Sequence, residues 1–218
     1  MSGATLRQNR VTFAPIMLLM RAAVSVLALL TLGLQAPVLA GPVVSAQSII
    51  VNPTKTDLWV NVRTNRDPSG SRTPVYAQGD HLEFYTRVNR DAYVYLFNLD
   101  PYGNVTLLAS NGLQASGNFV KANTTRVFPK KGKKSSFSRA VPQGVNKVLA
   151  LASVTPLNME QIARFEAQQA DTATVNAQGQ AGFARALSII VTPVKPEGWT
   201  TDTATYRVTA PKSSKGRR

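Results

Sequence analysis

The stretch "DAYVYLFNLDPYGNVTLLAS", residues 91–110, places the strongest constraint on how this chain can fold. Seven of the eight residues from Ala92 to Leu99 are apolar or aromatic, so an extended strand here has two apolar faces. Such a strand is usually central in its sheet and covered on both sides. The "DPYG" break then supplies Pro at the second turn position and Gly where positive φ is needed. The segment predicts a hairpin at the centre of a sheet.

Further segments also have the alternation or the apolar content of short strands. In residues 80–89, for example, Leu82, Phe84 and Val88 share one face. Two later segments predict helices: 155–170, which opens with Thr-Pro, and 180–191, which stops before Pro193 and has a strand as its alternative. We therefore expect a mainly β protein, an antiparallel β-sandwich of about seven to nine short strands with one or two helices added near the C-terminus. The other predicted strands are 48–51, 57–64, 124–129, 135–141, 146–154 and 204–210.

The first 46 residues contain three arginines and no acid, followed by an apolar run and small residues. This is the order of a secretory signal. We expect a signal peptide at 1–40, with cleavage after Ala46 as the alternative and Met20 as a second candidate start. An uncleaved anchor is the other reading, but the apolar run from Ala22 to Leu34 is shorter than the ~20 residues that span a bilayer. A single β-sandwich domain over 47–210 and a basic disordered tail over 211–218 would follow.

Composition narrows the chemistry that is open to the chain. The formal net charge is +14, which favours anionic partners. There is no cysteine and only one histidine, so thiol chemistry and a multi-histidine zinc site are excluded. We expect no cofactor, no metal site and no catalytic residues. Because we expect export, nucleic acid is an unlikely partner, and no transmembrane span should remain after signal cleavage.

Seven cations fall within 19 residues, in a region with no acid between Asp100 and Glu160. On a hairpin they would form a concentrated positive tip, which attracts phosphate, carboxylate or sulfate groups. A solubilising loop without a partner is the alternative reading. The predicted anion- and partner-binding residues are Lys121, Arg126, Lys130, Lys131, Lys133, Lys134 and Arg139.

Two weaker candidates come from the aromatic residues and from the histidine. Trp59, Tyr85 and Trp199 could stack on sugar rings, with core packing as the alternative. His81 and Glu83 share one face of a predicted strand and could form an acid–base pair, with a surface histidine as the alternative.

The residues "GDHLEFYTRVNRDAYVYLFNLDPYGNVTLLAS", "TRVFP" and "VPQGVNKVLALAS" resemble a bacterial family known as domain of unknown function 4384. The similarity covers about residues 75–156, and Ser110-Asn111 departs from the Pro-Asn of the family pattern. The C-terminal part is similar in style to extended members in envelope and surface-layer proteins of deinococcal-type bacteria. The resemblance implies a sandwich module on an exported protein and carries no catalytic residues.

Together these features favour an exported, non-enzymatic interaction module located in the periplasm or at the cell envelope and surface. It would dock through its basic loop to an anionic envelope polymer, lipid headgroups or an acidic envelope protein of the wall, outer membrane or surface layer. The alternatives are a carbohydrate-binding module that uses the aromatic residues and, less favoured, a hydrolase built around His81.

Overall fold

The computed structural model describes residues 50, 52, 54–108, 115–130, 137–164 and 172–212. The chain divides into two compact units, Met1–Leu39 and Ala40–Arg218, and all described residues belong to the second. The predicted signal segment and residues 213–218 of the predicted tail lie outside the described part. None of the helices in that part is long and apolar enough to cross a membrane.

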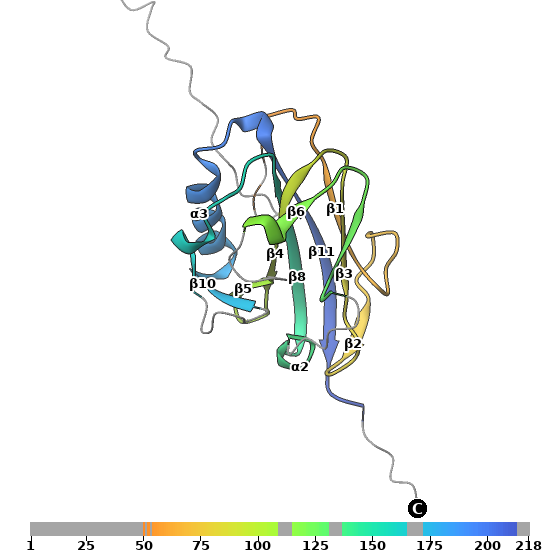
Figure 1. The fold of residues 1–218 in the computed structure, drawn as a ribbon. Helices are drawn as coiled ribbons and strands as arrows, with labels where there is room; N and C mark the ends of the chain where they lie inside the picture. Colours follow the sequence, from red (N-terminus) through yellow and green to blue (C-terminus); the bar gives the residue numbers. More distant parts are fainter. Residues whose placement is uncertain are drawn as a thin grey trace, which may run out of the picture. The chain divides into compact units, whose positions relative to one another are not determined.

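Two sheets form the body of this unit (Figure 1). The small sheet has the antiparallel order β1-β3-β7. The large sheet has the order β2-β11-β8-β4-β5-β10-β9, and β6 pairs with β4. Every neighbouring pair in the large sheet is antiparallel except β2 with β11, which is parallel. The strands are β1 (Val60–Thr64), β2 (Val75–Ala77), β3 (Phe84–Val88), β4 (Ala92–Leu99), β5 (Asn104–Leu108), β6 (Phe119–Val120), β7 (Thr125–Phe128), β8 (Gly144–Ser153), β9 (Ala163–Arg164), β10 (Thr172–Gln178) and β11 (Trp199–Thr209).

Helical segments are few in the described residues. There are two α-helices, α2 (Phe137–Ala140) and α3 (Gly179–Val191), and three short 3-10 turns. The turns are η1 (Ala115–Asn118), η2 (Met159–Gln161) and η3 (Pro196–Gly198). The predicted mainly β sandwich is confirmed. The strand number exceeds the expected range because the structure adds two- and three-residue strands such as β2, β6 and β9.

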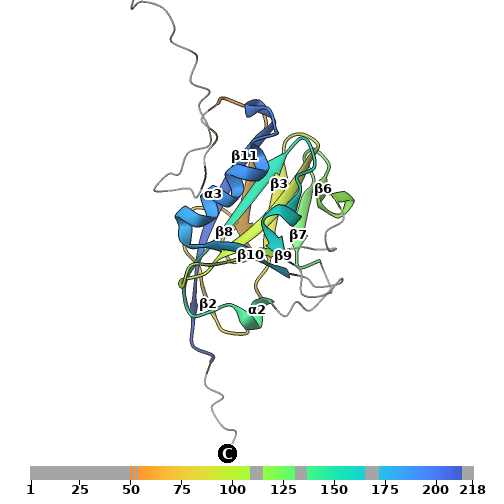
Figure 2. The same cartoon turned by 90° about the vertical axis from the view of Figure 1, so that its left-hand side faces the viewer.

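The large sheet is buried on both faces. On one face, alternate residues of its central strands pack with Val62, Phe84 and other residues of the small sheet. On the other face, Phe97 and Leu149 pack with Phe183 and Leu187 of α3. Figure 1 shows α3 on one side of the large sheet and the small sheet on the other, and Figure 2 shows α3 in front of the sheet. Strand β4 lies between β8 and β5, as its two apolar faces predict.

The hairpin turn between β4 and β5 is anchored at both of its ends. The Asp100 carboxylate accepts hydrogen bonds from the backbone N–H groups of Tyr102 and Asn104, at 2.8 Å each. Gly103 has φ of 87°, and a Cβ there would lie 3.0 Å from the backbone nitrogen of Gly179. The close approach lets Gly103 accept a hydrogen bond from the Gly179 N–H at 2.8 Å, which ties the turn to the start of α3.

The two sheets are joined along the β1 edge of the small sheet, and β7 forms the other edge of that sheet. The Asp202 carboxylate on β11 accepts a hydrogen bond from the Val62 N–H of β1 at 2.8 Å. This contact joins β11 to the outer edge of β1, and burial raises the pKa of Asp202. At the opposite edge of the small sheet, β7 pairs with β3 and with no other described strand. Strand β7 is therefore a free edge of the small sheet in the described part of the chain.

Two predicted elements are wrong in the described residues. The helix predicted for 155–170 is absent over 155–164, where the chain forms η2 and β9. The Tyr95 hydroxyl accepts a hydrogen bond from the Leu157 N–H at 2.8 Å and donates to the Leu157 carbonyl at 3.4 Å, which fixes this segment against β4. Residues 137–140, predicted as strand, form α2, because the Phe137 ring packs on Phe84 and Phe128 and turns the chain inward.

Replacing Phe183 by Ala tests the layer that α3 adds to the sheet. The ring is fully buried and lies 5.1 Å from the Phe97 ring. We expect Phe183→Ala to lower the free energy of unfolding by about 3–5 kcal/mol, measured by chemical denaturation. The control is Ile189→Ala on the same helix, where the side chain is 59 % exposed and the loss should stay below about 1 kcal/mol. Equal losses in the two variants would show that α3 does not cover the sheet as described.

The Asp80 carboxylate closes the turn after β2. It accepts hydrogen bonds from the Ala77 N–H at 3.0 Å and from Arg66 at 2.8 Å, and pairs with Lys212 at 3.1 Å. These contacts, with the backbone hydrogen bond from Ala77 the largest, lower the pKa of Asp80 to about 2.

The pKa of Asp80 in the folded protein lies below its ordinary value of 3.8. The ionised carboxylate therefore stabilises the fold at pH values above 3.8, and this stabilisation is lost as the pH falls towards 2. We expect Asp80→Asn to lower the Tm at pH 7, and its deficit relative to the wild type to shrink as the pH falls from 3.8 to about 2. Thermal unfolding followed by circular dichroism measures both. The control is Asp57→Asn, at an exposed aspartate, and its Tm should equal that of the wild type at each pH. A Tm deficit of Asp80→Asn that stays constant across this range would contradict the proposed role of Asp80.

Candidate anion-binding site

The described members of the predicted basic set do not form one positive tip. Lys121 lies before β7 and Lys130 lies just after it, so the strand separates them. Arg139 is exposed on the short helix α2. Lys131, Lys133 and Lys134 lie outside the described residues. The described members therefore belong to separate places: Lys121 and Lys130 flank β7, Arg126 lies on β7, and Arg139 lies on α2.

Arg126 is the member of this set whose side chain points into the sandwich. In the β3–β7 pairing, Thr86 lies opposite Arg126 and Phe84 lies opposite Phe128. Directly paired residues project from the same face of a sheet. Thr86 and Phe84 are buried beneath the large sheet, so Arg126 lies on that inner face. Its side chain therefore lies between the two sheets, on the β7 side.

The Arg126 guanidinium is partly buried without a hydrogen-bond partner for one of its nitrogens. Within the described chain, Nη1 is buried and donates a hydrogen bond to no acceptor. Burial lowers the pKa of Arg126, but arginine remains protonated at neutral pH. A buried donor without a partner costs about 1–3 kcal/mol, and more when it is charged. The site therefore favours binding of an acceptor from outside the chain.

Arg66 shows what an arginine with a structural role looks like in the same protein. Its Nη1 donates to the Val75 carbonyl at 2.6 Å, and its Nη2 donates to Asp80 at 2.8 Å. The guanidinium also lies 4.4 Å from the centroid of the Tyr76 ring. Arg126 has no comparable carboxylate, and none of the ion pairs between described residues includes it. The contrast indicates that Arg126 is not held for a salt bridge within the fold.

A planar guanidinium can bind a carboxylate or a phosphate through two parallel hydrogen bonds. In a partly desolvated position, such a pair is stronger than the same pair on the surface. Positive charge at Lys121, Lys130 and Arg139 would add screened attraction from the exposed rim. The arrangement is suited to one anionic group that reaches into the β7 edge.

The predicted aromatic residues separate into an exposed and a buried group. Trp59 is 43 % exposed, and Tyr85 is half-buried with the Arg63 guanidinium 4.9 Å from its ring centroid. Both lie on the outer face of the small sheet. Trp199 was predicted as a stacking residue, and this is wrong. Only 3 % of its surface is exposed, because at the start of β11 its ring packs into the core beside α3.

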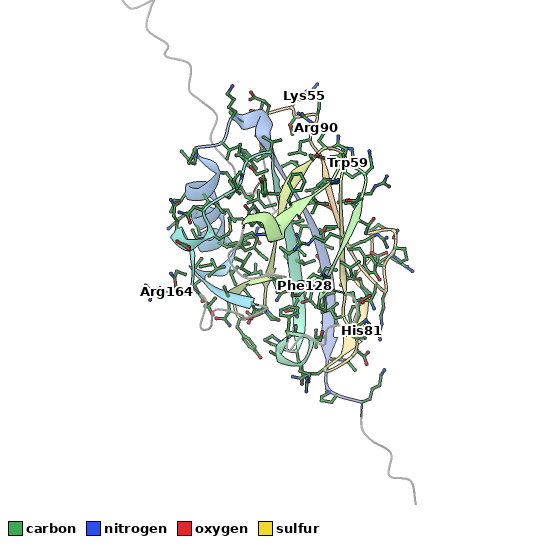
Figure 3. All side chains as sticks on the ribbon, viewed as in Figure 1. Lys55, Trp59, His81, Arg90, Phe128 and Arg164 are labelled. Atoms are coloured by element: carbon green, nitrogen blue, oxygen red, sulfur yellow. The ribbon has the colours of Figure 1, made fainter. Side chains whose placement is uncertain are left out.

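His81 lies at the other end of the small sheet from Trp59 (Figure 3). Its Nε2 is 3.0 Å from Glu83 Oε1, and the Tyr85 hydroxyl donates to Glu83 Oε2 at 2.7 Å. This hydrogen bond, the largest cause, raises the pKa of Tyr85. The imidazole is largely exposed, so the pair sits on the surface of the strand rather than in a cleft.

Carboxylates in the described chain are mostly engaged by backbone groups. Asp67 accepts hydrogen bonds from the Ser69 hydroxyl and the Arg72 N–H, which lower its pKa to about 2. Asp91 accepts from the Ala122 N–H. Among the described residues, no three histidine or acidic side chains gather as metal ligands. These acids hold turns and loops in place.

The sequence did contain a signal for the inward position of Arg126. In "TTRVFP", Phe128 lies two residues after Arg126, and residues two apart on a strand share a face. A buried phenylalanine therefore implies an inward arginine. Sequence reasoning included Arg126 only as one of seven cations in a loop and did not separate it from the exposed ones.

The sequence profile of the family described as "Domain of unknown function (DUF4384)" matches residues 75–156 of this chain. This confirms the resemblance over that region, which runs from β2 to the end of β8 and includes Arg126. No curated protein and no solved structure matches the chain significantly.

Proposed function

With residues 75–156 identified as a match to the DUF4384 family, we propose that this protein is a non-enzymatic interaction module that binds an anionic polymer of the cell envelope. The observation that carries the proposal is the partly buried guanidinium of Arg126, whose Nη1 has no partner among the described residues. A carboxylate or phosphate group of the polymer would supply the missing acceptor.

The position of Arg126 favours a polymer with projecting anionic groups over a flat surface. The side chain extends from the edge strand β7 into the space between the small and the large sheet. A carboxylate or phosphate on a chain can reach into such an edge, whereas a broad protein surface would have to displace β7. Exposed cations near both ends of β7 would then contact neighbouring charges of the same polymer.

The net charge of the chain supports the same class of partner. The formal charge is +14. Among the described cations, Arg66, Arg72 and Lys212 pair with aspartates, and the other lysines and arginines form no ion pair with a described acid. Long-range attraction of this kind is screened by salt over about 8 Å at physiological ionic strength. Binding should therefore weaken as salt is added, while the contact with Arg126 should be affected less than the contacts at the rim.

The location in the envelope is part of the proposal and rests on the N-terminal segment. Residues 1–46 have the charge, apolar core and small-residue order of a secretory signal. The absence of cysteine is compatible with a location inside or outside the cytoplasm. The large sheet, which is covered on both faces, supplies a hydrophobic core without disulfides. Mass spectrometry of the N-terminus of the protein isolated from cell fractions tests this part separately.

Replacing Arg126 by Met separates binding from stability. Removal of a partly buried charge without a partner should leave the Tm unchanged or raise it, since a hydrophobic side chain of similar length fills the space. Binding to polygalacturonate and to polyphosphate, measured by isothermal titration calorimetry, should weaken by about tenfold or more. Arg126→Lys keeps the charge but loses the planar guanidinium, so its affinity for the polymers should lie between those of the wild type and Arg126→Met.

The matched control is Arg87→Met on the neighbouring strand β3. Arg87 is exposed and its Nη2 donates to Asn123 at 3.4 Å, so its loss should weaken binding by less than about threefold. If Arg126→Met binds both polymers as tightly as the wild type, the proposal fails. The two polymers distinguish the sources of the anion, because one presents carboxylates and the other presents phosphates.

A second candidate function has one observation in its favour, the exposed indole of Trp59 on the outer face of the small sheet. Flat aromatic rings can stack on sugar rings through area burial, which does not depend on charge. We expect Trp59→Ala to reduce binding of chitin oligosaccharides, and we expect this binding to persist in high salt. The readout is Trp fluorescence on titration with the oligosaccharides. No response of the wild type would remove this candidate and leave the Arg126 proposal in place.

A further inference from the structure

A cavity of about 270 Å³ lies on the face of the large sheet that α2 covers. Strands β4, β5 and β10 contribute polar side chains, and α2 with the residues after it contributes an apolar wall. No lysine or arginine is among the residues that line the cavity in the described chain. It is therefore different in chemistry from the Arg126 site, which is built to attract an anion.

The polar side chains form a row across three neighbouring strands. Asn98 on β4 is paired with Thr106 on β5, and Thr106 is paired with Thr174 on β10. Neighbouring strands lie about 4.8 Å apart, so the three side chains are spaced at that interval across the row. Thr172 lies two residues before Thr174 on the same face and extends the row along β10.

The partners of these groups show which of them are available. Asn98 is only 2 % exposed and is fixed, since its Oδ1 accepts from the Tyr206 hydroxyl at 2.7 Å and its Nδ2 donates to Asn146 at 3.4 Å. The Asp100 carboxylate already accepts hydrogen bonds from the backbone N–H groups of Tyr102 and Asn104 in the hairpin turn. The hydroxyl groups of the threonines carry no hydrogen bond to any part of the chain that the structure describes. They can both donate to a ligand and accept from it.

The opposite wall has a different character. Phe137, Ala140, Val141 and Pro142 face the threonine row across the cavity, and Phe137 is fixed by ring contacts with Phe84 and Phe128. A ligand that fits must combine hydroxyl groups on one side with an apolar face on the other. Sugar rings have this arrangement, with hydroxyls at the rim and C–H groups on the faces.

We propose that this cavity binds a small uncharged, hydroxyl-rich ligand of about the size of one sugar ring. The hydroxyls of the ligand bond to Thr106, Thr172 and Thr174, and its apolar face packs on Phe137. The volume is just below the usual range of small-molecule pockets, which limits the ligand to a single ring or a short polyol. The cavity does not include Arg126, so this proposal can be tested independently of the proposed function.

The test uses the full chain labelled with ¹⁵N and titrated with D-glucose, N-acetyl-D-glucosamine and glycerol up to about 50 mM, a range that saturates millimolar binding. We expect at least one of the three probes to shift the amide signals of Thr106, Thr174 and Ala140. The double variant Thr106→Val/Thr174→Val should weaken this binding about tenfold or more. Its Tm should not fall, because the two hydroxyls lose no hydrogen bond to the described chain.

Two controls make the result specific. Thr125→Val removes an exposed hydroxyl on β7, away from the cavity, and should leave the amide shifts unchanged. Arg126→Met should also leave them unchanged while it loses polygalacturonate binding. If none of the three probes shifts the cavity amides, or if the shifts persist in the double valine variant, the inference is wrong.

Discussion

The burial of the large sheet on both faces is the constraint on which the rest of the structure depends. Strand β4 has no solvent-facing side, so the chain must supply a layer above it and a layer below it. The small sheet provides one layer and α3 provides the other. The matched family region of 75–156 contains β3 and β7 of the small sheet but lacks β1, α3 and β11. The family segment is therefore the centre of the domain rather than the whole of it.

Most of the central sheet could be predicted from the alternation of apolar residues. The β4–β5 hairpin, the buried face of β3 and the helix at 180–191 all followed from local periodicity and turn chemistry. The errors occur where long-range contacts decide the local structure. The segment after Thr155 has helical spacing in its sequence, but the hydroxyl of Tyr95, 62 residues away from Leu157, bonds to its backbone. No local pattern contains that information.

The candidate site was predictable in composition and only partly in arrangement. A high density of cations near β7 was visible in the sequence, but its division between the exposed ends and the inward Arg126 depends on the register of β7 against β3. The threonine row was not predicted at all. Thr106 and Thr174 are 68 positions apart, and only the pairing of β5 with β10 places them side by side. The local sequence around a threonine does not indicate which residues pair with it on a neighbouring strand.

The position of β11 has a consequence for how the protein is made. This last strand lies between β2 and β8, so the large sheet has a gap until the final residues of the domain have been synthesised. The parallel pairing with β2 joins segments separated by more than a hundred residues, and such contacts form slowly. The large sheet is therefore completed only after β11 has been synthesised. A chain that has to pass through a translocation channel before it folds would benefit from this delay.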